Sequence, residues 1–149
     1  MPLNNFGIVV PSRLYRSGQP DALGFLNLRA IGIHKIIKLN SDQEYPLDLE
    51  MRQFELVVDH FAVDMWKPDL QGVRVVAAHI AASMSNGAVL VHCTHGRDRT
   101  GLIIGAYRLI YDHWMLPEVL KEFSDYGATG IIKLVDHEII EALTEVSKQ

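Results

Sequence analysis

Cysteine is nearly absent from this chain of 149 residues and occurs once, at Cys93. A single cysteine cannot form a disulfide within the chain, so the fold does not depend on an oxidising compartment. It also excludes a zinc site with several thiolate ligands. A lone cysteine is usually a small core residue, so a chemical role for Cys93 must be argued from the residues around it.

Long apolar runs and an excess of positive charge are absent as well. No stretch approaches the roughly 18 apolar residues that a membrane-spanning helix needs, so we expect no integral membrane contact. Residues 1–13 lack a basic start followed by an apolar core, so we expect no signal peptide and a cytoplasmic location. The formal net charge of −4 argues against a general nucleic-acid binder. Any anion-binding surface must therefore be local.

Strand-like and helix-like patterns alternate along the chain. Extended segments are predicted at residues 8–10, 14–16, 33–39, 55–63 and 88–92. Helices are predicted at residues 46–53, 69–84 and 100–114, at residues 21–30 with Leu23, Leu26 and Ala30 on one face, from Pro117 onward, and along a final stripe of Ile132, Val135, Ile139, Leu143 and Val146. This alternation predicts one α/β domain over residues 1–149, with a central, mostly parallel sheet flanked by helices on both faces.

The loop after the 88–92 strand is the expected site, because ligands of such sheets bind at the carboxyl ends of strands. It contains the pattern His92-Cys93-x-x-Gly96-x-x-Arg99-Thr100-Gly101. A loop that turns into a helix can direct several backbone N–H groups at one point, and the helix N-terminus adds partial positive charge. Gly96 allows the turn because it has no side chain. The predicted ligand is a phosphate group.

The side chains of this loop suggest separate chemical roles. The positive surroundings favour the thiolate of Cys93, which we predict is ionised at neutral pH and acts as the nucleophile. Arg99 offers a planar fork of donors that can hold two phosphate oxygens. We expect the Thr100 hydroxyl to donate to the sulfur and His92 to organise the loop through its ring. Taken singly each residue is ordinary, and the combined spacing is what indicates function.

The motif resembles the phosphate-loop signature of the protein tyrosine and dual-specificity phosphatase superfamily. Looser similarity to compact dual-specificity-like members extends over residues 14–20 (LYRSGQP) and 28–33 (LRAIGI). The resemblance implies a phosphocysteine intermediate that water hydrolyses in a second step, with neither a metal nor another cofactor.

The resemblance also implies a general acid on a loop upstream of the cysteine. We favour Asp64, which follows a predicted strand in a segment, DMWKP at residues 64–68, that resembles the acid loop of cysteine phytases. Asp69 is an alternative similar to the Trp-Pro-Asp loop of tyrosine-specific enzymes with one residue inserted, although an Asp before a helix is commonly a cap. Asp98 is a third candidate, since some lipid phosphatases of the superfamily carry an Asp at this position.

Several further residues are predicted to bind the substrate: Thr94, His95, Gly96, Arg97, Asp98 and Lys67. The cationic members suit a substrate with several phosphates, although a loop lysine such as Lys67 is often only solvated. We therefore favour an inositol polyphosphate, as expected of a phytase-like enzyme. The alternative is a phosphoprotein carrying phosphotyrosine, phosphoserine or phosphothreonine, because no segment before Asp64 obviously builds a deep tyrosine pocket.

Two other functional classes fit the sequence less well. A pseudo-phosphatase that only binds phosphorylated partners usually lacks the cysteine, the arginine or the acid, and this chain has all three. A sulfur-transfer enzyme also uses a cysteine loop before a helix, but that function leaves residues 99–101 unexplained.

Overall fold

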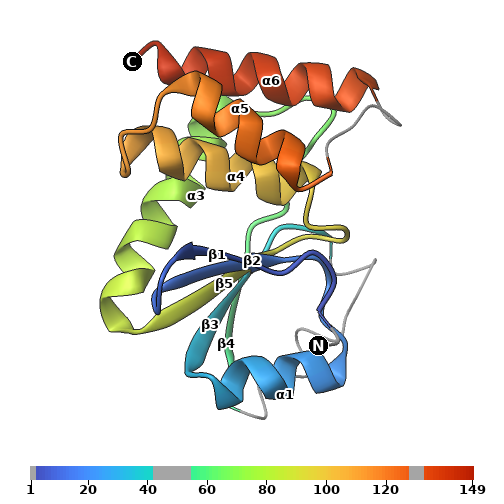
Figure 1. Cartoon of the computed structure of the whole chain (residues 1–149), viewed down its shortest axis with the longest axis vertical. Helices are drawn as coiled ribbons and strands as arrows, with labels where there is room; N and C mark the ends of the chain where they lie inside the picture. Colours follow the sequence, from blue (N-terminus) through green and yellow to red (C-terminus); the bar gives the residue numbers. More distant parts are fainter. Residues whose placement is uncertain (1–2, 42–54, 128–132) are drawn as a thin grey trace.

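The computed structural model describes residues 3–41, 55–127 and 133–149. A five-stranded sheet lies at the centre of the molecule in the order β1-β2-β5-β3-β4 (Figure 1). The strands are β1 (Gly7–Val10), β2 (Leu14–Ser17), β3 (Ile33–Lys38), β4 (Val57–His60) and β5 (Ala88–His92). β1 is antiparallel to β2, and every other pair is parallel. The predicted α/β class with a mostly parallel sheet is confirmed.

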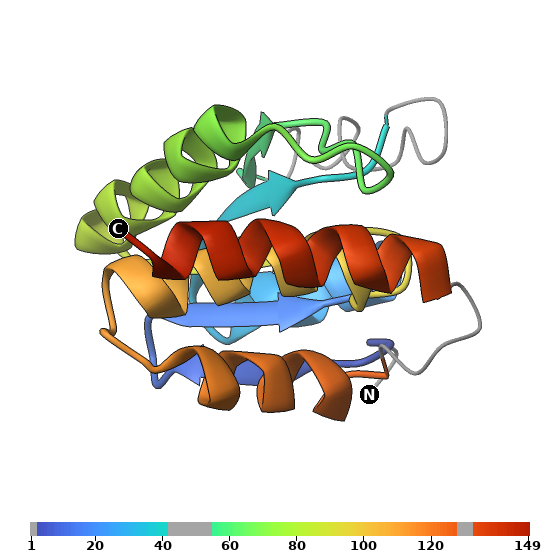
Figure 2. The same cartoon turned by 90° about the horizontal axis from the view of Figure 1, so that it is seen from above.

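Helices cover both faces of this sheet, as predicted. They are α1 (Ala22–Ala30), α3 (Leu70–Ser83), α4 (Asp98–Ile110), α5 (Leu116–Asp125) and α6 (Lys133–Ser147), with a short 3-10 turn at Met84–Asn86. α1 lies on one face, and the other four helices lie on the opposite face (Figure 1). Seen from above, α4 lies beneath α6, with α3 and α5 to either side (Figure 2). None of the described helices combines the length and apolarity needed to cross a bilayer.

β5 and α4 form the centre of the core. All five residues of β5 are buried, which explains its continuous apolar sequence, because strands flank it on both sides and helices cover both faces. α4 is buried from Asp98 to Arg108, apart from the partly exposed Arg99. The loop between these two elements is therefore held by the most rigid part of the fold.

Several helix predictions hold in detail. Asp69 caps α3, whose Val73, Ala77 and Ile80 are buried as the pattern predicts. In the C-terminal helix the stripe residues Ile139, Leu143 and Val146 are buried, whereas Ile132 and the side chain of Val135 lie outside the described residues. The predicted helix at residues 46–53 also lies outside them.

Three predicted boundaries or faces were wrong. α4 begins two residues before Thr100 and ends at Ile110, because the loop enters the helix directly and Tyr111 terminates it. The strand predicted at residues 55–63 is shortened to β4, which lies at the edge of the sheet with few apolar neighbours. In α1 the buried face consists of Phe25 and Leu28, whereas Leu23 and Leu26 are 58% and 44% exposed.

Candidate active site

A cavity of about 240 Å³ opens at the carboxyl end of β5. Its lining consists of Met65, Cys93, Thr94, His95, Arg97, Asp98 and Arg99. All of these except Met65 belong to the loop predicted to hold phosphate. The fold therefore brings the predicted nucleophile together with the cationic side chains of the loop.

The path of the loop depends on glycine at two places. Gly96 has a φ of +72°, a left-handed conformation that side chains disfavour, and a Cβ there would lie 2.6 Å from the Gly18 nitrogen and 2.7 Å from the Ser17 carbonyl carbon. A Cβ on Gly18 would lie 2.9 Å from the Thr94 carbonyl oxygen. The phosphate loop therefore packs backbone against backbone on the segment that follows β2, and only glycine leaves room for this contact.

Cys93 lies at the base of the cavity and is only 2% exposed. The next helix begins at Asp98, so the N-terminus of α4 closes the loop, as the anion-site prediction requires. His92 is completely buried, and its Nδ1 lies 3.2 Å from the Cys93 carbonyl oxygen. The ring also meets Phe25 edge-on, with centroids 6.2 Å apart. These contacts suit an organising role for the imidazole.

Polar side chains at the end of β3 and just after it contact the loop, and the sequence did not predict this support. Arg99 Nη2 donates to the Thr94 hydroxyl oxygen at 3.0 Å, and Asn40 Nδ2 donates to the same oxygen at 3.2 Å. Lys38, which is fully buried, donates to Asn40 Oδ1 at 2.7 Å. The polar residues at the end of the apolar 33–39 strand could have revealed this support, since parallel strands place their carboxyl ends at one edge of the sheet.

Thr100 differs from its expected role in this structure. It lies in the first turn of α4 and is completely buried. Its hydroxyl oxygen has no hydrogen-bond partner within the described part of the chain, so the expected bond to the Cys93 sulfur is not formed here.

Asp98 is the acidic member of the cavity lining. Burial raises the pKa of its carboxyl group, and repulsion from Asp136 acts in the same direction. Arg97, His95 and Arg99 oppose the rise, with Arg97 Nη2 at 3.8 Å from the carboxylate. The raised pKa means that Asp98 retains its proton to a higher pH than an ordinary aspartate does.

The three remaining predicted residues lie outside the cavity that contains Cys93. Asp64 is exposed, and its carboxylate accepts from the backbone N–H groups of Trp66 at 2.9 Å and Lys67 at 3.2 Å. Asp64, Lys67 and Asp69 line a neighbouring cavity of about 270 Å³. Asp69 accepts from the Gln71 N–H at 3.2 Å as a helix cap. Of the 64–69 segment, Met65 is the residue that lines the Cys93 cavity.

Comparison with known proteins places this site among phosphatases. The family model described as "Tyrosine phosphatase family" matches residues 1–149. "Probable tyrosine-protein phosphatase DG1060" of Dictyostelium discoideum is 31% identical over 148 residues, which cover 95% of this chain and 86% of that protein. Inositol diphosphatase DSP5 of Arabidopsis thaliana is 28% identical over 129 residues, which cover 83% of this chain and 62% of that protein.

The solved structures show the same fold. The crystal structure of TpbA from P. aeruginosa in complex with pTyr matches with a TM-score of 0.79 and 22% identity, and the match covers 97% of this chain and 91% of that one. The sheet and helices described above are therefore those of a known phosphatase architecture.

Proposed function

Because this chain belongs to the tyrosine phosphatase family and is a phosphoric monoester hydrolase, we propose that it acts through a phosphocysteine intermediate on inositol polyphosphates. The observation that carries the proposal is the lining of the Cys93 cavity, where Arg97, Arg99 and His95 outnumber the one acidic residue, Asp98, on a protein of net charge −4. A site of this charge suits a substrate whose reacting phosphate has further phosphates beside it.

In the first step the Cys93 thiolate attacks the phosphorus atom. A P–S bond forms as the P–O bond to the alcohol breaks, and the leaving oxygen takes a proton from a carboxylic acid. Arg99 and the backbone N–H groups at the start of α4 hold the phosphate oxygens while their charge redistributes. The alcohol then departs and phosphate remains bonded to the sulfur.

In the second step water attacks the phosphorus of the phosphocysteine. The carboxylate formed in the first step takes the proton from this water, the P–S bond breaks, and inorganic phosphate leaves with the thiolate restored. One carboxyl group thus serves as acid and then as base. The reaction needs no group beyond the side chains of the chain and water.

For this carboxyl group we propose Asp98 in place of the Asp64 that the sequence favours. Asp98 lines the Cys93 cavity, and its raised pKa suits a general acid, because the group keeps its proton to a higher pH than an ordinary aspartate does. The Asp64 carboxylate is instead bound by two backbone N–H groups of its own loop. Asp64 would have to leave these bonds in order to reach the leaving group.

Two substrate classes have independent support. The name of the relative DSP5 is that of an inositol diphosphatase, which together with the cationic lining supports inositol polyphosphates. The name of DG1060 is that of a tyrosine-protein phosphatase, which supports a phosphoprotein substrate as the second candidate. Arg97 and His95 would bind neighbouring phosphates of the first class, and they have less to bind on a monophosphate.

The test is phosphate release from inositol hexakisphosphate, a diphosphoinositol polyphosphate and a phosphotyrosine peptide, compared by kcat/KM. We expect the inositol substrates to react faster, Cys93→Ser to be inactive, and Arg97→Ala to lower kcat/KM more for them than for the peptide. Faster turnover of the peptide would establish the phosphoprotein substrate instead. No vanadate-sensitive release from any of the three would contradict an enzymatic role and favour a binding protein.

A further inference from the structure

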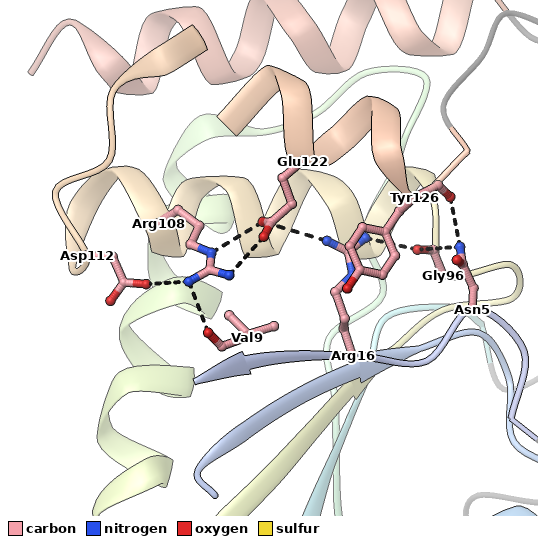
Figure 3. A network of polar contacts seen from close by, with 8 residues as sticks. All are labelled: Asn5, Val9, Arg16, Gly96, Arg108, Asp112, Glu122 and Tyr126. Atoms are coloured by element: carbon pink, nitrogen blue, oxygen red, sulfur yellow. Dashed lines mark hydrogen bonds and ion pairs between the residues drawn. The ribbon is translucent and has the colours of Figure 1, made fainter. Parts of the chain in front are cut away.

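A buried arginine lies against the outside of the phosphate loop, and the mechanism above does not use it. Arg16, near the end of β2, is only 1% exposed. Its Nη2 donates to the Gly96 carbonyl oxygen at 3.0 Å (Figure 3). The two residues are separated by 80 positions in the sequence. A fully buried guanidinium is costly to desolvate, so its position calls for a reason.

The contact with Gly96 fixes the direction of one peptide group of the loop. The Gly96 carbonyl and the Arg97 N–H belong to the same planar trans peptide, so they point in opposite directions. Asn5 Nδ2 also approaches the Gly96 oxygen, at 3.4 Å, and donates to the Tyr126 carbonyl oxygen at 2.8 Å. Because Arg16 and Asn5 hold the carbonyl outward, the Arg97 N–H is directed toward the inside of the loop, where an anion needs donors.

The charge of Arg16 is compensated only in part. Among the described residues, its carboxylate partner is Glu122, whose Oε1 lies 3.9 Å from Arg16 Nη1. Glu122 is bound more closely by Arg108, with Nη2 at 2.8 Å and Nε at 3.3 Å from its oxygens (Figure 3). The Tyr126 ring stacks on the guanidinium, with its centroid 3.6 Å from Cζ. Among the described contacts of Arg16, the hydrogen bond to the loop carbonyl is shorter than the ion pair with Glu122.

Cys93 is within electrostatic reach of this charge. Burial lowers the pKa of Arg16, and Glu122, Tyr126 and Cys93 oppose that effect through their negative charges. An arginine remains protonated even when buried. The geometric link between Arg16 and the sulfur is the loop itself, since Gly96 follows Cys93 by three residues and both lie between β5 and α4.

We propose that Arg16 is a positioning residue of the phosphate loop, which holds the Gly96 peptide with its carbonyl outward and stabilises the thiolate of Cys93 by buried positive charge. The proposal rests on the proposed function only in that the thiolate is the nucleophile. Its consequence for the sulfur can be measured without any substrate.

The experiment measures the rate at which iodoacetamide alkylates Cys93, the only thiol in the chain, as a function of pH. In Arg16→Met, which removes the charge and the donors, we expect the midpoint of this profile to rise by about one pH unit. In Arg16→Lys, which keeps the charge, we expect a smaller rise. Below the midpoint, kcat/KM of Arg16→Met falls about tenfold, because each pH unit is a tenfold change in thiolate.

Glu122→Gln tests the same charge in the opposite direction. It removes the negative group beside Arg16, so we expect the alkylation midpoint to fall. A purely structural role for Arg16 predicts lower thermal stability in both variants and no opposed shifts of the midpoint. If Arg16→Met does not fold, opposed shifts in Arg16→Lys and Glu122→Gln still support the proposal, and shifts of the same sign overturn it.

Arg13→Met is the matched control. Arg13 also donates to a backbone carbonyl oxygen, that of Met84 at 2.9 Å, and lies just before the same strand, but it does not contact the phosphate loop. We expect its alkylation profile to match the wild type. A folded Arg16→Met with an unchanged midpoint overturns the proposal for Arg16, whereas a wild-type thiol that reacts only at alkaline pH contradicts the proposed nucleophile itself.

Discussion

At the scale of the residue, the carboxyl groups of Asp98 and Asp64 differ in their surroundings and in their hydrogen-bond partners. Asp98 lies in the wall of the Cys93 cavity with a raised pKa, whereas Asp64 holds backbone N–H groups of its own loop. Burial favours the protonated form of the Asp98 carboxyl, which is the form that a general acid needs.

Turnover of aryl phosphates with increasingly basic leaving groups tests whether Asp98 or Asp64 is the general acid. If Asp98 supplies the proton, Asp98→Asn lowers kcat/KM, which reports the first step, about 100-fold or more for the most basic leaving groups. The loss is much smaller for p-nitrophenyl phosphate, whose leaving group needs little protonation. Asp64→Asn should leave the dependence on leaving group as in the wild type. A steep dependence in Asp64→Asn alone would return the role to Asp64.

Asp98 also makes a prediction for stability. Because its pKa is raised in the folded state, the folded protein binds more protons than the unfolded chain, and stability falls as pH rises from the ordinary carboxyl range near 3.9 toward neutrality. Asp98→Asn removes the ionised buried group, so we expect it to unfold at a higher urea concentration than the wild type at pH 7. At acid pH, where the wild-type carboxyl is protonated, the two proteins should be equally stable, and a difference that persists there would contradict this cause.

At the scale of the element, α4 is packed tightly enough that a single methyl group matters. A Cβ on Gly105 would lie 2.8 Å from Leu143 Cδ2 on α6 and 3.0 Å from Val119 Cγ1 on α5. We expect Gly105→Ala to lower the free energy of unfolding by about 1–3 kcal/mol, because the three helices must move apart. Urea denaturation at 25 °C measures the change.

The control for this substitution is Gly72→Ala in α3. There the added Cβ would lie 3.2 Å from Asp69 Oδ2, the end of a side chain that can move. Alanine favours a helix over glycine by up to about 1 kcal/mol, so Gly72→Ala should leave stability unchanged or raise it. Equal losses in both variants would show that the loss at Gly105 does not come from helix packing.

The sequence predicts the first and last residues of an element best where the whole element is buried, because its apolar residues then form a continuous run. β5 is a central strand with both faces covered, so all of its residues before His92 are apolar and the limits of the run are visible. β4 is an edge strand with a half-exposed sequence, and its limits were misjudged. The place of the phosphate loop, between β5 and α4, was predictable because the motif depends on local spacing. Its supports, Arg16 and Asn40, were not, because strand order decides which distant residues meet.

At the scale of the whole molecule, a second carboxyl group gives stability the opposite pH dependence. Burial raises the pKa of Asp59, but bonds from His79 at 2.7 Å and Lys35 at 3.0 Å outweigh it, so the pKa lies below its usual value. The folded state then binds fewer protons, and this contribution, present at neutral pH, is lost as pH falls below the ordinary carboxyl range near 3.9.

We therefore expect Asp59→Asn to be less stable than the wild type at pH 7. Its contacts join β4 to β3 and α3, so the loss should appear as a lower midpoint in urea rather than as a change in activity. The deficit should shrink as both proteins are taken to pH 3, because the contribution of the ionised wild-type carboxyl declines once the pH is below the ordinary carboxyl range. Thermal unfolding followed by circular dichroism at the two pH values measures this, and a deficit that grows in acid would contradict it.

The order of strands in the sheet also constrains how the protein is made. β5 lies between β2 and β3, although it is synthesised after both, so the first two strands and the β3–β4 pair remain separate on the ribosome until residues 88–92 emerge between them. The hydrogen bond of Arg16 to Gly96 can form only after residue 96 has been made. The hydrogen bond of Asn5 to Tyr126 can form only after α5 has been made. A nascent chain that ends just after the phosphate signature still lacks the contact of Asn5 with Tyr126, so we expect it to be inactive until α5 has been made.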